Sequence, residues 1–352
     1  MGQQRLRQLV GSIKDKASLS KAAILMMNTS SLQVAIIRAS SHRPSSPPHH
    51  RHISAVLSYG LGSRATASLC IHALMGRLHS TRDPSVALKC LITLHHIIKR
   101  GSFILQDQLC LLCPKNNVAG KNYLNLSNFK DSSTSQSWAL SFWVRWYARV
   151  LESIVFVYTS GLFGSSSSSS SSEGTTITTR LSGVLNGDLL RELDAFVGVM
   201  EEISWAPDPD PSTLAENRLP NEAVWLAGED YCSAQTEIMA RLQELEERLG
   251  AILSVAADTV ELSCALKRIE NCKERLVSMF ANKKGSGSSS SSSMWELAGE
   301  MKRRIDQREL YGDGRLENYR GGTESARLGD DRVRRIGAES RLLLLGSTSF
   351  RG

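Results

Sequence analysis

The chain has 352 residues and a formal net charge of +7, with 41% hydrophobic and 6% aromatic residues. This hydrophobic content is enough to build a large core, and no run approaches the roughly 20 uncharged apolar residues that a membrane-spanning helix needs. No series of alternating apolar and polar residues predicts a β-sheet, so we expect an all-α protein.

The seven cysteines are scattered over the chain, at positions 70, 90, 110, 113, 232, 264 and 272. Most of them fall inside apolar helical stretches, which predicts buried, reduced thiols in an intracellular protein. Cys110 and Cys113 form one CxxC pair. Because no second pair and no βαβ pattern accompany it, the pair predicts neither a zinc site nor a redox motif.

The positive charge is concentrated at the N-terminal end. Eight basic residues precede Ile53, against the single acid Asp15, so residues 1–52 carry a net +7 and the other 300 residues are neutral. The eight are Arg5, Arg7, Lys14, Lys16, Lys21, Arg38, Arg43 and Arg51. Such an uneven distribution indicates an anionic partner, whether phospholipid headgroups, nucleic acid or an acidic protein.

Residues 5–16 read as a short basic amphipathic helix. The apolar side has Leu6, Leu9, Val10 and Ile13, and the other side has Arg5, Arg7, Lys14 and Lys16. Two interpretations stay open, the first helix of a bundle or a helix that lies on a membrane. A second apolar helix is expected over 20–38.

The stretch 36–53 reads IIRASSHRPSSPPHHRHI and joins this helix to the next. It has no acid, and its prolines keep the backbone extended. Its cationic or titratable side chains are Arg38, Arg43 and Arg51 with His42, His49, His50 and His52. A loop of this composition predicts fixed donors for an anion.

The clearest helix follows one expected over 63–79. In TRDPSVALKCLITLHHIIKRG, Asp83 is the expected N-cap, Pro84 the first helical residue and Gly101 the stop. Apolar residues surround most of this helix, which predicts burial on two sides. His95 and His96 are adjacent and so diverge by about 100° on a helix, which excludes one shared metal.

Four aromatic residues follow in a helix that runs to about residue 158. We interpret Trp138, Trp143, Trp146 and Tyr147 as core residues. A serine-rich stretch at 164–179 then predicts a disordered loop.

The C-terminal half is also predicted to be helical. A helix is expected over 188–205, where the Asp188-Leu189-Leu190 triplet is interpreted as core rather than as a clathrin-binding signal. Helices over 222–249 and 254–280 are predicted to pair as an antiparallel hairpin. A Gly/Ser linker at 285–293, a helix over 295–310 and a disordered tail at 311–352 complete the chain.

Three segments carry a resemblance to a known family. They are SRATASLCIHALMGRLHSTRDPSVALKCLITLHHIIKRGSFILQDQL, NYLNLSNFKD and WVRWYARVLE. With weaker agreement downstream, roughly residues 10–310 resemble the ANTH domain of plant clathrin assembly proteins. The resemblance implies a right-handed α-solenoid over 1–310, without a sheet, a cofactor or catalytic activity.

The cationic loop resembles the phosphoinositide site of that family. The family pattern is Lys, nine residues, Lys, one residue, Lys or Arg, then His or Tyr. Here Arg38 is followed by ten residues, His49, one residue, Arg51 and His52. The resemblance implies that these four hold phosphatidylinositol 4,5-bisphosphate. The expected additional membrane contacts are Arg5, Arg7, Lys14, Lys16 and His50.

The resemblance also implies a monomeric endocytic adaptor. Such a protein is cytoplasmic and lies peripherally on plasma-membrane clathrin-coated pits, on coated vesicles and at the Golgi. Its implied partners are the clathrin heavy chain and a vesicle SNARE helix, which is received in a groove of the solenoid. The stretch 311–352 has no Asp-Pro-Phe, Asn-Pro-Phe or acidic-leucine motif. Direct clathrin contact therefore stays open.

The sequence also bears on two other functional classes. A nucleic-acid-binding protein would use the basic residues 1–52, but this region has no Phe, Trp or Tyr for base stacking, which leaves only phosphate contacts. A metal-dependent hydrolase would use His42, His49, His50 and His52. Their loop supplies no Asp, Glu or Cys ligand, and no phosphate-binding loop, nucleophile elbow or HExxH motif occurs, so no enzyme is expected.

Overall fold

The computed structural model describes residues 10–18, 20, 27–43, 45–111, 122–162, 180–208, 217–280 and 293–308. The chain divides into two units, Met1–Asp306 and Gln307–Gly352, and the architecture below belongs to the first. Helices and no strand occur in the described ranges, which confirms the all-α prediction. The predicted loop at 164–179, most of the linker at 285–293 and the tail at 311–352 lie outside the described residues.

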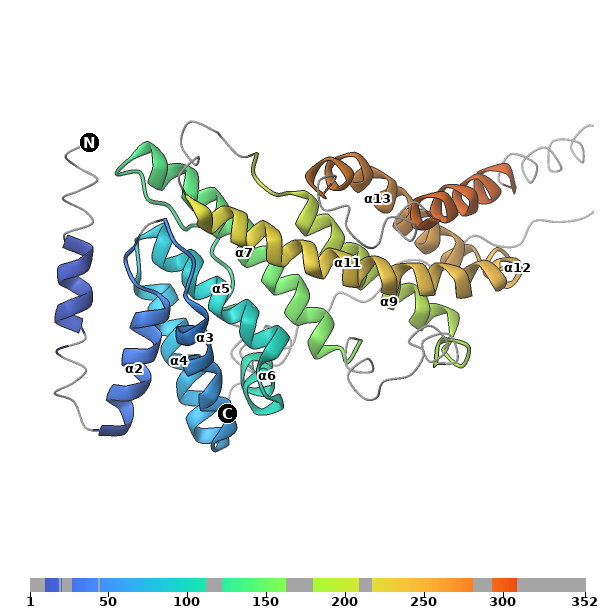
Figure 1. Ribbon diagram of the computed structural model, residues 1–352. Coiled ribbons are helices and arrows are strands. Elements are labelled where there is room, and N and C mark those ends of the chain that lie inside the picture. The colour runs from blue at the N-terminus through green and yellow to red at the C-terminus, as the bar shows by residue number, and fades with distance from the viewer. Residues whose placement is uncertain are drawn as a thin grey trace, which may run out of the picture. The chain divides into compact units, whose positions relative to one another are not determined.

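The N-terminal helices carry and surround the cationic loop (Figure 1). Residues 10–18 are helical, and α2 follows at Met27–Ala39. After the loop come α3 at His50–Leu57, the short 3-10 helix η1 at Ser58–Leu61 and α4 at Arg64–Ser80. α2 packs against α3 and α4, so both ends of the loop rest on one small helical group.

The middle helix α5, Pro84–Arg100, is the most enclosed element. Its N-terminus is as predicted, because Asp83 Oδ1 accepts hydrogen bonds from the backbone N–H of Ser85 at 2.8 Å and of Val86 at 3.4 Å. It contacts α2, α3, α4, α6 (Phe103–Cys110), α7 (Ser135–Thr159) and α11 (Arg218–Glu247). This confirms the expectation of a helix packed on more than one side.

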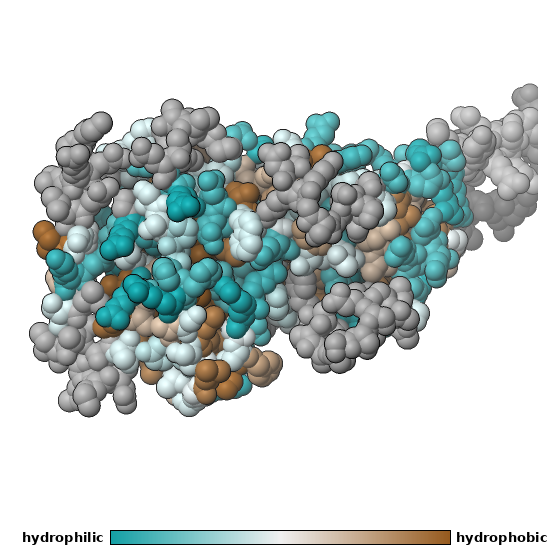
Figure 2. Space-filling model, viewed as in Figure 1, coloured by the Kyte–Doolittle hydropathy of each residue, from teal (hydrophilic) through white to brown (hydrophobic). Residues whose placement is uncertain are grey.

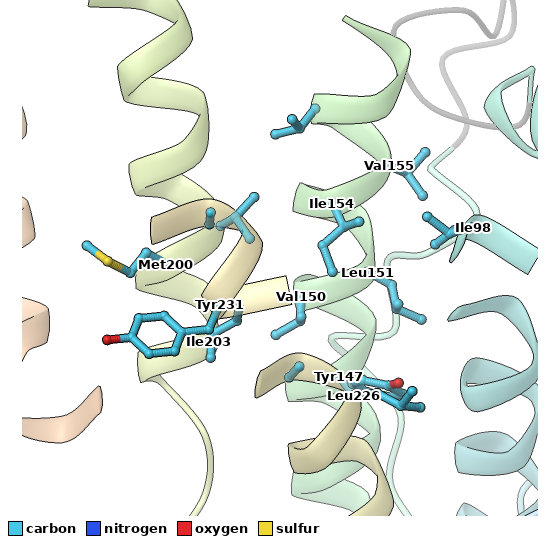
Figure 3. Close-up of a cluster of buried hydrophobic side chains, with 14 of the residues drawn as sticks. Ile98, Tyr147, Val150, Leu151, Ile154, Val155, Met200, Ile203, Leu226 and Tyr231 are labelled. Carbon is cyan, nitrogen blue, oxygen red and sulfur yellow. The ribbon is translucent and has the colours of Figure 1, made fainter. Parts of the chain in front are cut away.

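The core continues from α5 through α7 to α9, Asn186–Ser204. Figure 3 shows α7 between Ile98 of α5 and Met200 and Ile203 of α9. The buried α7 residues Val150, Leu151 and Ile154 fill this space. The apolar spacing along α7 therefore joins the N-terminal helices to the C-terminal ones.

The C-terminal helices differ from the predicted hairpin. α11 and α13 (Ala256–Phe280), with the short α12 (Leu249–Ile252) between them, each pack mainly on α9. A direct contact between α11 and α13 is the stacking of Tyr231 on Phe280, at 5.1 Å between ring centroids. The pairing prediction was wrong because the apolar faces of both helices are covered by a helix from earlier in the chain.

The last described helix, 293–308, begins at Ser293, which had been assigned to the linker. It buries Met294, Trp295, Ala298 and Met301. None of the described helices is long and apolar enough to cross a membrane.

The exposed fractions of the α7 aromatic residues and of the cysteines correct two further expectations. Trp143, Trp146 and Tyr147 are in the core, but Trp138 is 42% exposed and stacks edge-on against Phe142. Trp138 lies in the first turn of α7, before the neighbouring helices enclose it.

Among the cysteines, Cys70, Cys90 and Cys272 are buried, whereas Cys232 and Cys264 are exposed. Cys113 lies outside the described residues. Over the visible face, hydrophilic residues predominate and apolar residues form small separate patches (Figure 2).

Candidate functional site: the pocket between α2 and α3

Arg38, Arg51 and His52 line one open pocket between α2 and α3, with a volume of about 940 Å³. We call it the α2–α3 pocket. The other lining residues are Ser31, Val34, Ala35, Ala55, Ser58 and Tyr59. None of the lining residues is acidic, so the pocket combines two permanent positive charges, a histidine and hydroxyl groups.

Local capping places these side chains. The hydroxyl and the backbone N–H of Ser40 both donate to the Ile36 carbonyl, at 2.7 and 2.9 Å, which satisfies the last turn of α2 and leaves Arg38 exposed there. At the other end of the loop, His49 is the N-cap of α3, and its Nδ1 accepts from the Arg51 backbone N–H at 3.2 Å. The extended segment before it contains Pro47 and Pro48.

The cationic groups also contact one another. Arg51 Nε donates to His52 Nε2 at 2.8 Å, and the rings of His49 and His52 are 6.1 Å apart. Partial burial lowers the pKa of His52, as do the nearby Arg51, Arg38 and His49 side chains, against an opposing contribution from the Arg38 backbone. His52 is therefore neutral near pH 7 in the free pocket, and an incoming anion favours its charged form.

The predicted site residues fall into three groups. Arg38, Arg51 and His52 share the pocket, His49 stands next to it through its contact with His52, and His50 is exposed at the first position of α3. Lys14 lines a different pocket, together with Arg77 and Arg82. Lys16 is exposed on the same helix. Arg5 and Arg7 lie outside the described residues.

Asp15 links helix 10–18 to the loop between α2 and α3. Asp15 accepts from the His42 backbone N–H at 2.8 Å, its other oxygen lies 2.6 Å from His42 Nδ1, and Arg77 Nη2 approaches that oxygen at 3.5 Å. Burial alone would raise the pKa of Asp15, but the hydrogen bonds and charges of His42 and Arg77 hold it below its usual range. His42 therefore joins the loop to helix 10–18 through Asp15 and is not among the residues that line the α2–α3 pocket.

The sequence analysis did not identify Lys89, a residue of α5 that binds the backbone of the loop. Lys89 is buried in α5, and its Nζ donates to the carbonyls of Ser41 at 2.8 Å and Arg43 at 2.5 Å. Burial lowers its pKa to about 8, which nearby Asp83 and Asp15 partly oppose. The available signal was one lysine within an otherwise apolar helical run, VALKCLI.

The adjacent histidines of α5 belong to the core. His95 Nδ1 and the Tyr147 hydroxyl are 2.7 Å apart, and His95 Nε2 lies 2.8 Å from Asp230 Oδ2. Lys99 pairs with the other oxygen of Asp230. No group of three or more residues suited to a metal ion occurs within the described part of the chain. The α2–α3 pocket therefore offers positive charge and hydrogen-bond donors for an anion.

Comparison with known proteins agrees with this architecture. The ANTH domain model matches residues 31–201, a range that contains most of α2, the loop and all of α3. "Putative clathrin assembly protein At4g40080" from Arabidopsis thaliana is 46% identical over 272 residues, which cover 76% of this chain and 73% of that protein.

Two further relatives come from the same plant. "Putative clathrin assembly protein At5g10410" is 30% identical over 281 residues, covering 77% of this chain and 79% of its own. "Putative clathrin assembly protein At2g01600" is 37% identical over 153 residues, 42% of this chain and 25% of its own. The fold, the position of the matched domain and these similarities lead to one conclusion: the chain belongs to the ANTH domain family.

Proposed function

We propose that this protein is a phosphatidylinositol 4,5-bisphosphate-binding endocytic adaptor of the clathrin coat, without catalytic activity. Arg38, Arg51 and His52 hold the headgroup phosphates, and His49 contributes from the edge of the pocket. The observation that carries the proposal is the convergence of these basic side chains from two helices on one open pocket that has no acidic lining residue.

The two arginines favour a ligand that has more than one phosphate group. Arg38 comes from α2 and Arg51 from α3, so one ligand with separated phosphates would engage a residue of each helix. Guanidinium groups donate paired hydrogen bonds to phosphate oxygens. Each basic residue near an anionic leaflet contributes about 1 kcal/mol.

Helix 10–18 supplies a second contact in this proposal. Val10 is 44% and Ile13 63% exposed, and Lys14 and Lys16 are exposed beside them. Apolar and basic residues on one exposed helix suit the boundary between headgroups and acyl chains. Together with Arg5, Arg7 and His50, this helix would add membrane affinity to the headgroup contact.

The proposed partners follow from the family. The relatives are named for clathrin assembly, and we place this protein on clathrin-coated pits and vesicles, and at the Golgi, as a peripheral monomeric protein. A vesicle SNARE is the second proposed partner. One candidate surface is a groove of about 570 Å³ that includes Phe156 of α7, Gly198 of α9 and Arg268 of α13.

Co-sedimentation of the full chain with vesicles tests the lipid function. Phosphatidylcholine vesicles with phosphatidylinositol 4,5-bisphosphate should pellet the protein, and vesicles with phosphatidylserine at the same total charge should pellet much less. Equal pelleting by both would contradict a built headgroup site and leave only general electrostatic attraction.

A mobility-shift assay separates this proposal from nucleic-acid binding. Duplex DNA and single-stranded RNA at 0.15 M salt should produce no shift at protein concentrations that saturate the phosphoinositide vesicles. A shift at lower concentrations than those needed for vesicles would favour the nucleic-acid interpretation.

A further inference from the structure

Ser46 is the one Ser or Thr directly followed by proline in the 352-residue sequence. It lies in the loop between α2 and α3 and is exposed, whereas its neighbour Ser45 is half-buried. Pro47 biases Ser46 toward extended backbone, the conformation in which a protein kinase reads a substrate strand. Protein kinases of the proline-directed class require this Ser-Pro order.

The backbone around Ser46 is fixed from two sides. Lys89 Nζ binds the Arg43 carbonyl at 2.5 Å, and the backbone N–H of Arg218, at the start of α11, donates to the Ser45 carbonyl at 3.1 Å. The Ser46 hydroxyl therefore belongs to a held and accessible segment, next to a helix that starts 172 residues further along the chain.

Several basic residues lie near Ser46 along the chain or across the contact between Ser45 and Arg218. Arg43 and His49 are each three residues away, which places their Cα atoms within about 10 Å. Arg218 is exposed, and the described residues provide no partner for its guanidinium. His49 and His50 form the N-terminus of α3, where the helix dipole favours an added negative charge.

We propose that Ser46 is a phosphorylation site for a proline-directed protein kinase and that its phosphate weakens phosphoinositide binding at the α2–α3 pocket. The regulatory half of this inference rests on the proposed lipid function, whereas the modification half does not. The phosphate would bind Arg218 and the α3 N-terminus and would compete within the chain for the cations that serve the lipid.

The covalent step uses ATP. The Ser46 Oγ attacks the γ-phosphorus, an Oγ–P bond forms, and the bond from that phosphorus to the bridging oxygen of ADP breaks. The hydroxyl proton passes to the base of the kinase, and ADP leaves.

The change in charge is large for this segment. Residues 38–52 contain Arg38, Arg43 and Arg51 and no acid, a net +3 with neutral histidines. A phosphoserine adds −1.5 to −2 near pH 7, which leaves about +1. Loss of this much positive charge beside an anionic leaflet should weaken vesicle binding at least tenfold.

The experiment treats the full chain with ATP and a mitogen-activated protein kinase, then measures phosphate incorporation and vesicle binding on the same sample. Stoichiometric phosphate at Ser46 and at least tenfold weaker binding to phosphatidylinositol 4,5-bisphosphate vesicles are expected. Ser46→Ala should abolish both effects. Ser45→Ala is the matched control, because its side chain precedes serine rather than proline, and it should retain both.

Arg218→Gln tests the proposed phosphate contact. Phosphorus NMR of the phosphorylated chain should give a second phosphate pKa below the ordinary value of about 6, and Arg218→Gln should move it back toward that value. An identical titration in both proteins would overturn the assignment of Arg218.

The outcomes are separable. Absence of phosphate on Ser46 overturns the modification site whatever the vesicles show. Full phosphorylation with unchanged vesicle binding overturns the switch and leaves the lipid function standing. Unmodified protein that does not bind phosphoinositide vesicles overturns the proposed lipid function and the switch together, while the incorporation assay still decides the modification site.

Discussion

Two regions of the molecule place a histidine beside a strong cation, and they differ in whether a carboxylate accompanies it. In the first, which we call the Asp230 cluster, Asp230 lies with His95, Lys99 and Tyr147 at the meeting of α5, α7 and α11. In the α2–α3 pocket, His52 lies with Arg51 and Arg38, and no acid lines the pocket.

The presence or absence of a carboxylate distinguishes a cluster whose charges are compensated within the fold from a pocket whose charges are not. Asp230 and His95 are buried, and each has a charged or hydrogen-bonding partner within the chain, so the cluster has no need of a ligand. Arg38 and Arg51 are exposed, and their positive charge is left uncompensated by the pocket. The same residue types are therefore paired within the fold in one place and leave an uncompensated positive charge in the other.

Removing the acid from the Asp230 cluster should have the largest effect on stability. Asp230→Asn leaves Lys99 without its counter-charge and His95 without its carboxylate partner, and we expect the free energy of unfolding to fall by about 3 kcal/mol in urea denaturation. The exposed neighbour Glu229 provides the control, because Glu229→Gln should cost less than about 0.5 kcal/mol. Similar losses in both variants would refute a specific role for the cluster.

The same carboxylate predicts a pH dependence. Burial alone would raise the pKa of Asp230, but His95 and Lys99 outweigh it and hold the pKa below the usual range. Its stabilisation is therefore complete above the ordinary aspartate pKa and is lost as pH falls through the lower folded-state value. Comparing wild type with Asp230→Asn from pH 6 to 2 should show the difference in stability shrinking in acid.

Lys89 shares a feature with each region. It is buried, as the Asp230 cluster is, and it binds the backbone of the loop that leads to the α2–α3 pocket. Lys89→Met should weaken vesicle binding several-fold, because the Ser41 and Arg43 carbonyls lose their donor, while unfolding changes by less than about 2 kcal/mol. Unchanged vesicle binding would show that the loop keeps its position without this contact.

The contribution of Lys89 to the free energy of unfolding also depends on pH. The folded-state pKa of about 8 is below the ordinary lysine value of about 10.4, so the unfolded chain binds more protons between these values. The contribution of Lys89 to stability therefore rises from pH 8 to 10. Lys89→Met should remove this rise when denaturation curves of the two proteins are subtracted.

Protonation of the pocket should strengthen lipid binding by a smaller factor. Because the pKa of His52 is lowered, the ring gains charge only as pH falls, and the bound phosphate favours that charged form. The added affinity is full below the free-state pKa and fades as pH rises through the bound-state pKa. Vesicle affinity should increase three- to tenfold from pH 7.5 to 6.0.

His49→Lys sharpens this prediction. A lysine keeps its charge over this range, so the variant should bind more tightly at pH 7.5 and depend less on pH. The ratio of the vesicle affinities of the variant and the wild-type protein at each pH removes the effect of lipid titration, because both proteins bind the same vesicles. A ratio of one at both values would place His49 away from the headgroup and show the ten-residue spacing from Arg38 to have been misread.

The smallest effect is expected from the C-terminal stretch. Deleting 311–352 should leave vesicle binding unchanged, since the basic residues of the proposed site all precede residue 53. Clathrin pull-down should also change little, because no clathrin motif was found there. A large loss of clathrin on truncation would reveal a motif that the sequence analysis overlooked.

Much of the helical order was predictable because its signals are local. The Asp83 cap, Pro84 and the continuous apolar run define α5, and the structure has it at Pro84–Arg100. The pairing of α11 with α13 was not predictable from spacing, because periodicity gives the apolar face of a helix but not its neighbour. Trp138 was misjudged for the same reason.

The candidate site was only partly predictable. The charge excess identified the loop, and Arg38, Arg51 and His52 do share a pocket. The supports of the loop come from Asp15, Arg77, Lys89 and the N-terminus of α11, which are contributed by four other parts of the chain. Long-range contacts of this kind depend on the packed arrangement and leave no pattern within the loop itself.

A vesicle titration of the double variant Arg38→Glu with Arg51→Glu is the sharpest test of a phosphoinositide site between α2 and α3. Reversing two pocket charges should weaken binding to phosphatidylinositol 4,5-bisphosphate vesicles at least 100-fold, with an unchanged helical circular dichroism spectrum. Lys267→Glu with Lys273→Glu changes the net charge equally at exposed positions of α13, and it should bind within about threefold of wild type. Equal weakening in both double variants, or full binding by the pocket variant, would contradict a phosphoinositide site between α2 and α3.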